Sequence, residues 1–327
     1  MKAFAYVRAS GEKAAVTALA APGGRALPIA GGMDLLGLMK DYVAQPDRLV
    51  SLKDLDAAIA RGPGGGLRIG AAVTLTDLAA HADARKLYPA LTEAAAEVGT
   101  PQIRNAGTVG GNLNQRPRCW YFRNEEFHCL KKGGSRCFAV DGENQYHAIF
   151  GDGPCHIVHP SSLAVPAIAL DARFRVLGPA GEREVPAADY YQMPDRNLLG
   201  ETVLGPHEIL THVILPAPGS ARNATYEVRF KQSHDWPLAM ASVALSMQGQ
   251  NVRGARIVMG AVAPVPWRAT AAETVLAGKR VTEGLAMEAA DAALAGARPM
   301  TENAYKIQIA RTAVKRAILK AAGMKVV

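Results

Sequence analysis

Four cysteines could bind a metal centre or form disulfides, and they are the only cysteines in this 327-residue chain. They are Cys119, Cys129, Cys137 and Cys155, separated by nine, seven and seventeen residues. Four cysteines allow three disulfide pairings. Structural zinc sites usually draw their ligands from closely spaced pairs, and this segment has no such pair. An iron–sulfur cluster accepts four thiolates at irregular spacing. The spacing alone leaves all three kinds of site open.

The residues around these cysteines favour the cluster, because nearby cations stabilise its negative charge and aromatic side chains keep water away. The segment has six basic residues: Arg116, Arg118, Arg123, Lys131, Lys132 and Arg136. Four aromatic residues lie between its first two cysteines: Trp120, Tyr121, Phe122 and Phe127. Four histidines lie in or beside it: His128, His147, His156 and His159. None of them is needed as a ligand, since four thiolates complete a cluster.

A glycine-rich loop precedes the cysteines in the stretch Leu27–Met39, which reads as a short strand, a turn and the start of a helix. Gly31 and Gly32 have no side chain, so a ligand can approach their backbone closely. Free N–H groups at a helix start suit an anion such as pyrophosphate. Asp34 is placed to cap the helix or to accept a hydrogen bond from a ligand hydroxyl.

A second loop, Gly107–Asn112, offers the same chemistry at the other end of a helical stretch, Thr76–Val98. Neither loop has the spacing G-x-G-x-x-G after a strand, so the sequence does not support a Rossmann dinucleotide site. Two glycine loops on either side of one helical stretch favour a cofactor-binding unit of another kind.

Three segments resemble one family: Ala30–Leu35 (AGGMDL), Ile103–Leu113 (IRNAGTVGGNL) and Gly205–Pro216 (GPHEILTHVILP). They are similar to the FAD-binding medium subunit of the molybdenum hydroxylases, the xanthine dehydrogenase and aldehyde oxidase superfamily. The resemblance covers essentially the whole chain. The cysteine segment resembles the branch with an extra [4Fe-4S] cluster, which includes flavin subunits of 4-hydroxybenzoyl-CoA reductase and of bacterial aldehyde oxidoreductases. It looks closer to the aldehyde oxidoreductase type.

The resemblance implies a role for particular residues. The four cysteines would bind the [4Fe-4S] cluster. Lys231 would lie near the flavin edge and stabilise the anionic reduced flavin. Many relatives carry Ser-Asp where this chain has Ser161 and Ser162, and a neutral hydroxyl is a weaker acceptor than a carboxylate. The residues implied to bind FAD are Ile29, Ala30, Gly31, Gly32, Met33, Asp34, Leu35, Thr108, Gly110, Gly111, Asn112, Ser162, Leu210 and Lys231.

These residues are expected to be positioned by an α+β fold. The first part, residues 1–215, is predicted to be a two-subdomain FAD-binding domain of the PCMH type, divided into about 1–58 and 59–215. The iron–sulfur insertion would span about residues 116–158. Residues 216–327 would form a C-terminal domain.

The C-terminal domain is predicted to contain a three-stranded antiparallel sheet and three helices. The predicted strands are Tyr226–Lys231, Ala239–Gln248 and Ala255–Val262. The predicted helices lie near Arg268–Ala277, Thr282–Ala295 and Glu302–Ala322. His234 and Asp235 have no nucleophile in a recognisable context beside them, so structural use is expected for both.

Composition limits the possible partners. The chain is 49% hydrophobic, but no apolar run reaches the roughly 20 residues that span a bilayer. The net charge of +8 is spread along the chain and aromatic residues make up only 6%, so a nucleic acid partner is not expected. An acidic partner subunit explains the charge better. The N-terminus lacks a signal peptide, so the protein is expected in the cytoplasm, or in the periplasm if a signal-bearing partner subunit exports it.

The sequence therefore predicts a FAD and [4Fe-4S] electron-transfer subunit of a molybdenum-dependent aldehyde oxidase. A large subunit with the molybdenum cofactor would oxidise the substrate, and a small [2Fe-2S] subunit would pass electrons on. FAD would deliver them to an external acceptor, so no catalytic residue is expected in this chain. The alternatives are the flavin subunit of a hydroxybenzoyl-CoA reductase-like or N-heterocycle hydroxylase complex, and a non-redox zinc-binding module.

Overall fold

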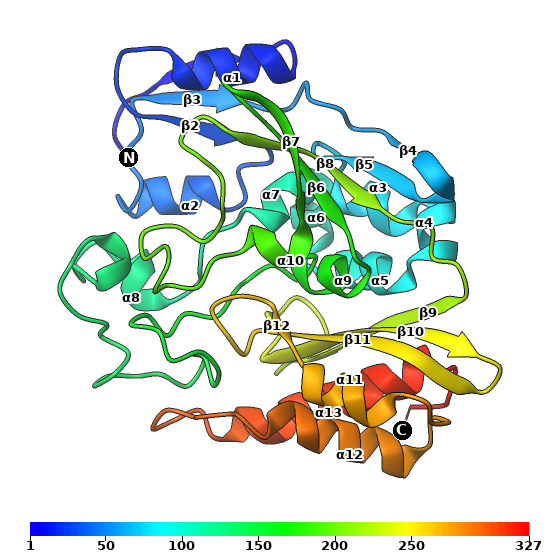
Figure 1. Cartoon of the computed structure of the whole chain (residues 1–327). Coiled ribbons are helices and arrows are strands. Elements are labelled where there is room, and N and C mark those ends of the chain that lie inside the picture. The colour runs from blue at the N-terminus through cyan, green and yellow to red at the C-terminus, as the bar shows by residue number, and fades with distance from the viewer. Residues whose placement is uncertain (327) are drawn as a thin grey trace.

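Three β-sheets follow one another from the N-terminus to the C-terminus in the computed structural model (Figure 1). The structure describes residues 1–326, so Val327, the predicted end of the C-terminal domain, lies outside the described residues. No helix within this range is both long and apolar enough to cross a bilayer.

The first sheet is parallel and has the strand order β1-β3-β2. Parallel neighbours need a crossover connection, which here includes the helices α1 and α2. The bounds are β1 Ala5–Arg8, α1 Glu12–Ala20, β2 Ala26–Ile29, α2 Leu35–Lys40 and β3 Arg48–Ser51. The glycine loop lies between β2 and α2, as the sequence predicts.

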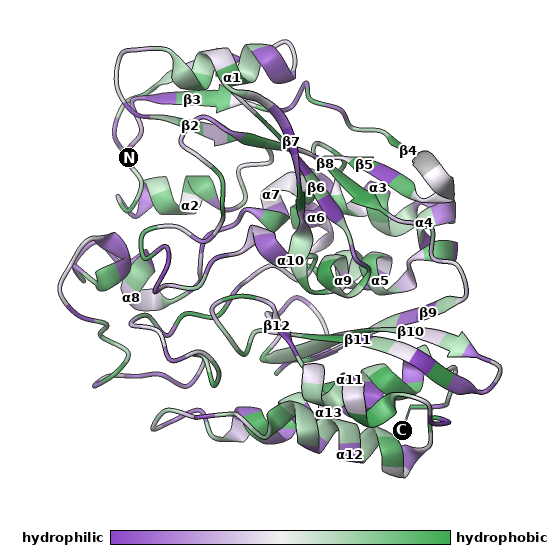
Figure 2. Cartoon of the chain, in the orientation of Figure 1, coloured by the Kyte–Doolittle hydropathy of each residue, from purple (hydrophilic) through white to green (hydrophobic). Residues whose placement is uncertain are grey.

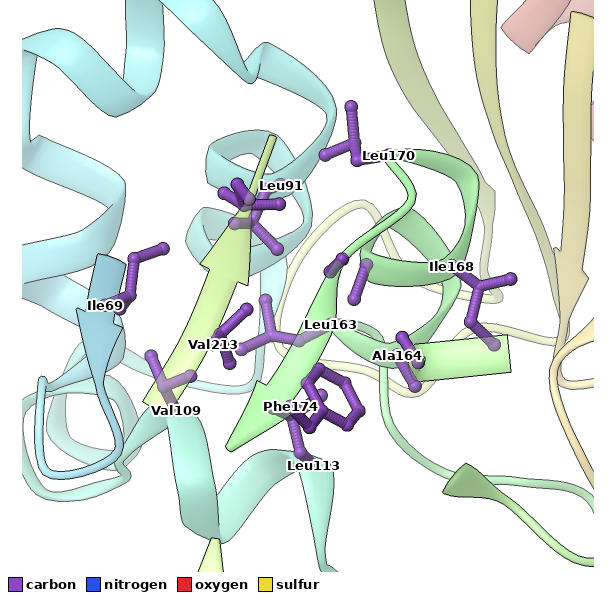
Figure 3. Close-up of a cluster of buried hydrophobic side chains, with 14 of the residues drawn as sticks. Ile69, Leu91, Val109, Leu113, Leu163, Ala164, Ile168, Leu170, Phe174 and Val213 are labelled. Atoms are coloured by element: carbon purple, nitrogen blue, oxygen red, sulfur yellow. The ribbon is translucent and has the colours of Figure 1, made fainter. Parts of the chain in front are cut away.

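The second sheet is antiparallel and has the order β4-β5-β8-β6-β7. Its strands are β4 Ile59–Arg61, β5 Leu67–Gly70, β6 Arg173–Gly178, β7 Gly181–Pro186 and β8 Ile209–Leu215, with a short 3-10 turn η1 at Pro63–Gly65. Its apolar residues share one core with the helices beside it. In Figure 3, Val109, Leu113 and Leu163 lie close to Phe174 and Val213 of the sheet.

Five helices separate β5 from the cysteine segment. They are α3 Leu75–Ala80, α4 Ala82–Leu87, α5 Pro89–Glu97, α6 Pro101–Ala106 and α7 Val109–Leu113. The prediction of one helical stretch over Thr76–Val98 was too simple. His81 has extended backbone angles and caps α4 with its ring. Tyr88 precedes a proline, and a residue in that position is disfavoured in the helical conformation.

The cysteine segment, residues 116–158, has little regular structure. It contains one short helix, α8 (Trp120–Arg123), and one 3-10 turn, η2 (Leu130–Lys132). In Figure 1 it extends to the side of the first two sheets around α8. Two further short helices follow it, α9 (Ala164–Ala169) and α10 (Ala187–Tyr190).

The third sheet is antiparallel and has four strands rather than the predicted three, in the order β12-β11-β10-β9. The extra strand has only two residues, which is too short to show the alternation of apolar and polar residues that predicts a strand. The strands are β9 Ala221–Val228, β10 Ala239–Gln248, β11 Asn251–Gly260 and β12 Trp267–Arg268. The helices α11 Thr270–Leu276, α12 Glu283–Leu294 and α13 Tyr305–Ala321 cover one face of this sheet (Figure 1).

The two faces of the third sheet belong to two different cores, because successive side chains of a strand point to opposite faces. Ala241 and Val243 of β10 pack with the helices α11–α13. Met240 of β10 and Val258 of β11 belong instead to the core of the second sheet. Figure 2 shows hydrophobic residues along β10 and β11, between the helices α11–α13 on one side and the second sheet with its helices on the other. The third sheet is therefore packed directly against the part of the chain that carries the glycine loops.

Candidate functional site

A cavity of about 1100 Å³ lies where the two glycine loops meet. Leu210 of β8 and Ser162, just before α9, complete its wall between the loops. All the residues that the resemblance implies for FAD line this cavity, except Lys231. The lining residues of that set are Ile29, Ala30, Gly31, Gly32, Met33, Asp34, Leu35, Thr108, Gly110, Gly111, Asn112, Ser162 and Leu210.

The first glycine loop has room for a ligand but none for a side chain. A Cβ atom on Gly31 would lie 2.0 Å from the carbonyl oxygen of Ala106. Gly32 has a φ of 74°, which favours glycine. Within residues 1–326, the backbone N–H groups of Gly31, Gly32, Met33 and Asp34 donate to no other group of the chain. They are available to an anionic ligand, as the sequence predicts.

The second glycine loop differs from the prediction, since the N–H groups of its three glycines are already bonded. Val109 N–H donates to Val73 O at 2.8 Å, and Gly110 N–H donates to Ala71 O at 2.9 Å. Gly111 N–H donates to Thr108 Oγ1 at 3.1 Å. The loop is fixed to the chain that leaves β5, and this contact uses its donors. Its glycines contribute bare backbone to the cavity wall, beside Thr108 and Asn112, rather than a second set of free N–H groups.

Asp34 makes no side-chain hydrogen bond to the start of α2, so its predicted role as a cap was wrong. It lines the cavity, and its role as an acceptor for a ligand hydroxyl stays a prediction. Its Oδ1 lies 2.5 Å from Arg123 Nη2 and 3.0 Å from Arg118 Nη2. Its Oδ2 accepts the backbone N–H of Arg116 at 2.8 Å. The carboxylate therefore fixes the start of the cysteine segment to the first glycine loop.

Asn112 fixes the serine pair beside the cavity. Its side-chain carbonyl accepts Ser161 Oγ at 2.7 Å and the backbone N–H of Leu163 at 3.3 Å. Ser162 lies between these two anchors, is buried, and lines the cavity.

Lys231 lies apart from the cavity because β9 ends at Val228, three residues earlier than the predicted strand. The chain bends there, and Lys231 N–H donates to Asp235 Oδ2 at 3.2 Å. His234 and Asp235 line the cavity in its place. His234 Nδ1 lies 3.2 Å from Gly99 O, a structural contact that fits the sequence interpretation. No sequence pattern predicts that the loop with His234 and Asp235 forms part of the cavity wall.

The four cysteines are all free thiols, which argues against the disulfide alternative. Cys129 and Cys155 are buried, and Cys119 and Cys137 are half-buried. Burial raises the pKa of Cys119 to about 11. The thiol of Cys155 donates to the sulfur of Cys137, and this bond lowers the pKa of Cys137 to about 5 and raises that of Cys155.

His147 reaches one of the thiols from the C-terminal end of the same segment. Its Nε2 lies 3.3 Å from Cys119 Sγ. Burial lowers the pKa of His147 to about 4, so the ring is neutral near pH 7. Its Nδ1 is buried without a partner among the described residues, which fits a neutral ring that carries its proton on Nε2. No group of three or more His, Cys, Asp or Glu side chains in residues 1–326 is arranged to hold a metal ion. This gives no support to the zinc alternative.

Buried ion pairs hold the middle of the cysteine segment to the chain between α10 and β8. Lys131 Nζ lies 2.9 Å from Glu201 Oε1, and Arg116 Nε lies 2.7 Å from Glu201 Oε2. Lys131 Nζ also donates to the carbonyl oxygens of Leu198 and Gly200, each at 3.0 Å. The segment therefore has a defined position beside the cavity, and Lys131 and Lys132 belong to the cavity wall.

The end of the segment is held by the C-terminal domain. Lys306 of α13 is buried, and its Nζ donates to the carbonyl oxygens of Tyr146, His147 and Ala261 at 3.2, 3.1 and 2.6 Å. Asn303 Nδ2 donates to His147 O at 3.0 Å. These bonds fix the backbone that carries the His147 ring against Cys119.

We expect Lys306→Met to lower the free energy of unfolding by about 3 kcal/mol, because three buried carbonyl groups lose the amine that donates to them. Urea unfolding of the full chain measures this loss. Lys315→Met is the matched control on the same helix, since Lys315 pairs with the exposed Glu283 and such a pair contributes less than about 1 kcal/mol. Equal stability of the two variants would contradict the role of Lys306 as an anchor.

The comparisons with known proteins agree with this geometry. Residues 2–218 match the family described as the FAD binding domain in molybdopterin dehydrogenase. Residues 224–321 match the CO dehydrogenase flavoprotein C-terminal domain. The chain belongs to this family of FAD-binding oxidoreductase subunits. The family resemblance that the glycine loops predict is thus confirmed, together with FAD as the cofactor of the domain and the mixed α and β fold.

Individual relatives cover nearly the whole chain. The aldehyde oxidoreductase FAD-binding subunit PaoB of Escherichia coli is 36% identical over 98% of this chain and 99% of its own length. The carbon monoxide dehydrogenase medium chain of Hydrogenophaga pseudoflava is 29% identical over 93% of this chain and 92% of its own.

Two solved structures are also similar. The carbon monoxide dehydrogenase structure from Hydrogenophaga pseudoflava has a TM-score of 0.77, with 28% identity over 98% of this chain and 97% of the other. Quinoline 2-oxidoreductase from Pseudomonas putida 86 has a TM-score of 0.76, with 27% identity over 99% of both chains.

Proposed function

We propose that this subunit holds FAD in the cavity between the glycine loops and passes electrons through it within a larger oxidoreductase. The observation that carries the proposal is the convergence of the first-loop N–H groups, the glycines of the second loop and Ser162 on one cavity. When bound, FAD would accept and release electrons. The residues of the chain bind it, orient it and limit the access of water.

The free amides of Gly31 and Gly32 would face the pyrophosphate, and Gly110 and Gly111 would let the cofactor approach the second loop. Leu210 would pack near the flavin ring. Lys231 is proposed to act only if its exposed loop moves toward the cavity, since the side chain lies outside the wall.

We further propose that the cysteine segment binds a [4Fe-4S] cluster. Four free thiols of one segment, none in a disulfide, support this. The lack of a compact three-ligand group is compatible with a cluster, because each thiolate then binds a different iron. Lys132 lies close enough to Cys119 and Cys129 to interact with their charges. The segment also lies beside the cavity, which would bring the two redox centres together.

The proposed partners are a large subunit with the molybdenum cofactor and a small [2Fe-2S] subunit, with an external electron acceptor. The relatives named as medium chains support a place in such an assembly. The similarity to an aldehyde oxidoreductase subunit favours an aldehyde as the substrate of the large subunit. The location is proposed to be the cytoplasm, or the periplasm if a partner carries an export signal.

The division of the chain into residues 1–215 and 216–327 is also proposed, with subdomains of about 1–58 and 59–215. The first family match ends at residue 218 and the second begins at residue 224, which supports the main boundary.

The visible absorption spectrum of the purified full chain tests both cofactors. We expect flavin bands near about 450 nm on top of broad iron–sulfur absorption. A colourless protein would overturn the proposed function, and flavin bands with no iron in the protein would overturn only the cluster.

The similarity to quinoline 2-oxidoreductase favours a second candidate, a complex that hydroxylates an N-heterocycle. The two candidates share this subunit and differ in the substrate pocket of the large one. Activity of the whole complex on aldehydes but not on N-heterocycles would support the first candidate, and the reverse would support the second.

A further inference from the structure

A carboxyl group is buried behind the cavity wall, on the face of β9 that points toward the glycine loops. Ala224, Tyr226 and Val228 pack with the helices of the C-terminal domain. Strand alternation places Thr225 and Glu227 on the opposite face. Thr225 Oγ1 confirms this direction, because it donates to Ala90 O of α5 at 2.9 Å. Glu227 therefore lies between the third sheet and the core of the FAD-binding part.

The Glu227 side chain contacts the cavity through one residue. It is 5% exposed and forms a side-chain hydrogen bond with Ser162, which lines the cavity. Its Oε1 has no hydrogen-bond partner among residues 1–326. A buried carboxylate oxygen normally has a hydrogen-bond partner. Glu201 Oε1 also lacks one, but it lies 2.9 Å from the ammonium group of Lys131, whereas the ion pair of Glu227 is at its other oxygen and is 4.0 Å long.

The positive charge near Glu227 does not fully offset the negative charge of its carboxylate. Arg229 Nε lies 4.0 Å from Glu227 Oε2, but Arg229 Nη2 pairs with the more exposed Glu97 of α5. One guanidinium thus faces two carboxylates. Met240, opposite Glu227 on β10, brings no charge. Burial raises the pKa of Glu227 to about 7, with Arg229 acting against it and Glu97 adding to it. The carboxyl can gain and lose a proton near neutral pH.

We propose that Glu227 is a positioning residue that sets the direction of the Ser162 hydroxyl toward the cavity and takes up one proton when the cofactor there is reduced. This inference rests on the proposed function, because it needs FAD beside Ser162. Ser162 is the only link that it requires between the buried carboxyl and the cavity.

The two protonation states present different groups to the cavity. While Glu227 is ionised, Ser162 donates its proton to the carboxylate and offers only lone pairs to a ligand. Once Glu227 is protonated, it donates to Ser162 Oγ, and the Ser162 proton can turn toward the cavity. Added negative charge in the cavity raises the pKa of Glu227 and favours the second state. No bond between heavy atoms forms or breaks. The proton comes from water and the electrons come from the partner subunits or from a chemical reductant.

The flavin midpoint potential of the full chain, measured with dithionite as the reductant between about pH 6 and pH 9, tests this inference. Above about pH 7 the wild-type potential should fall more steeply than that of Glu227→Gln, by about 30 mV per pH unit, which is one proton per two electrons. Gln keeps the size and the contact with Ser162 but cannot take up a proton. Glu93→Gln, in α5, is the matched control and should follow the wild type, since Glu93 pairs with Lys320.

FAD content is measured first in each protein, so that two failures can be told apart. Wild-type protein without FAD would overturn the proposed function and this inference with it. Equal FAD content and identical slopes in wild type and Glu227→Gln would overturn the inference alone. If Glu227→Gln does not fold, infrared difference spectra of the wild type decide: reduction at about pH 8 must produce a protonated carboxyl band, and its absence overturns the inference.

Discussion

Gly111→Val should give a folded protein that has lost its FAD. Gly111 lines the cavity, and a Cβ atom built there meets only Thr108 Oγ1, at 3.1 Å. The Thr108 side chain has to shift by a few tenths of an ångström, and outside the two chain neighbours and the backbone of the same helix no other atom of residues 1–326 lies within 4 Å of that Cβ. The valine side chain therefore takes up space at the cavity wall where the cofactor is proposed to lie. A direct overlap with a ligand removes far more than the 1.4 kcal/mol that corresponds to a tenfold change in affinity. We expect less than about one tenth of the wild-type FAD content.

The FAD released on denaturing the purified protein measures this effect, and circular dichroism checks the fold. Gly284→Val is the matched control, because Gly284 also lies in the first turn of a helix but has open space around it. It should retain FAD. Gly31→Val is a poorer test, since its side chain would collide with the Ala106 carbonyl and move the loop itself. Full FAD content in Gly111→Val would contradict the placement of the cofactor at the second loop.

Short-range patterns in the sequence were enough to find the cavity. A Gly-Gly turn between a strand and a helix predicts an exposed backbone, and two such loops predict one binding unit. The structure brings Gly32, Gly111, Ser162 and Leu210 to one cavity although they are far apart in the chain. Family resemblance supplied the last two residues, since neither has a local pattern of its own.

Contacts between distant segments are what the sequence could not reveal. Asp34 has the position of a helix cap, yet it binds arginines more than 80 residues away. Lys306 looks like one of the solvated cations on α13, yet it is buried under three carbonyl groups. Glu227 lies in an alternating strand where a polar residue is expected to face water. In each case another part of the chain covers the polar residue. The local pattern of polar and apolar residues carries no information about that contact.

The cluster proposal and the flavin proposal depend on different residues, so they can fail separately. The cysteine segment is attached to the rest of the protein by Asp34, by Glu201 and by Lys306, none of which needs iron. Loss of the cluster should therefore leave the flavin cavity largely formed.

Cys129→Ser should remove most of the iron from the protein while FAD stays bound. Cys129 is buried, and a serine hydroxyl in its place is a far weaker ligand for iron than a thiolate. A [4Fe-4S] cluster needs all four thiolates, so the loss of one should lower the iron content well below the wild-type value. The segment should also become easier to cut with protease, because its cross-link is gone.

Iron and FAD per chain, measured on the same sample, separate this result from general damage. Phe127→Leu is the control, since it disturbs the aromatic contacts with Tyr121 and Phe138 in the same segment without removing a thiol. It should keep its iron. Wild-type iron content in Cys129→Ser would show that Cys129 is not a ligand. Cys129 would then be a structural thiol, packed with Leu38, Met39 and Phe122 in one hydrophobic cluster.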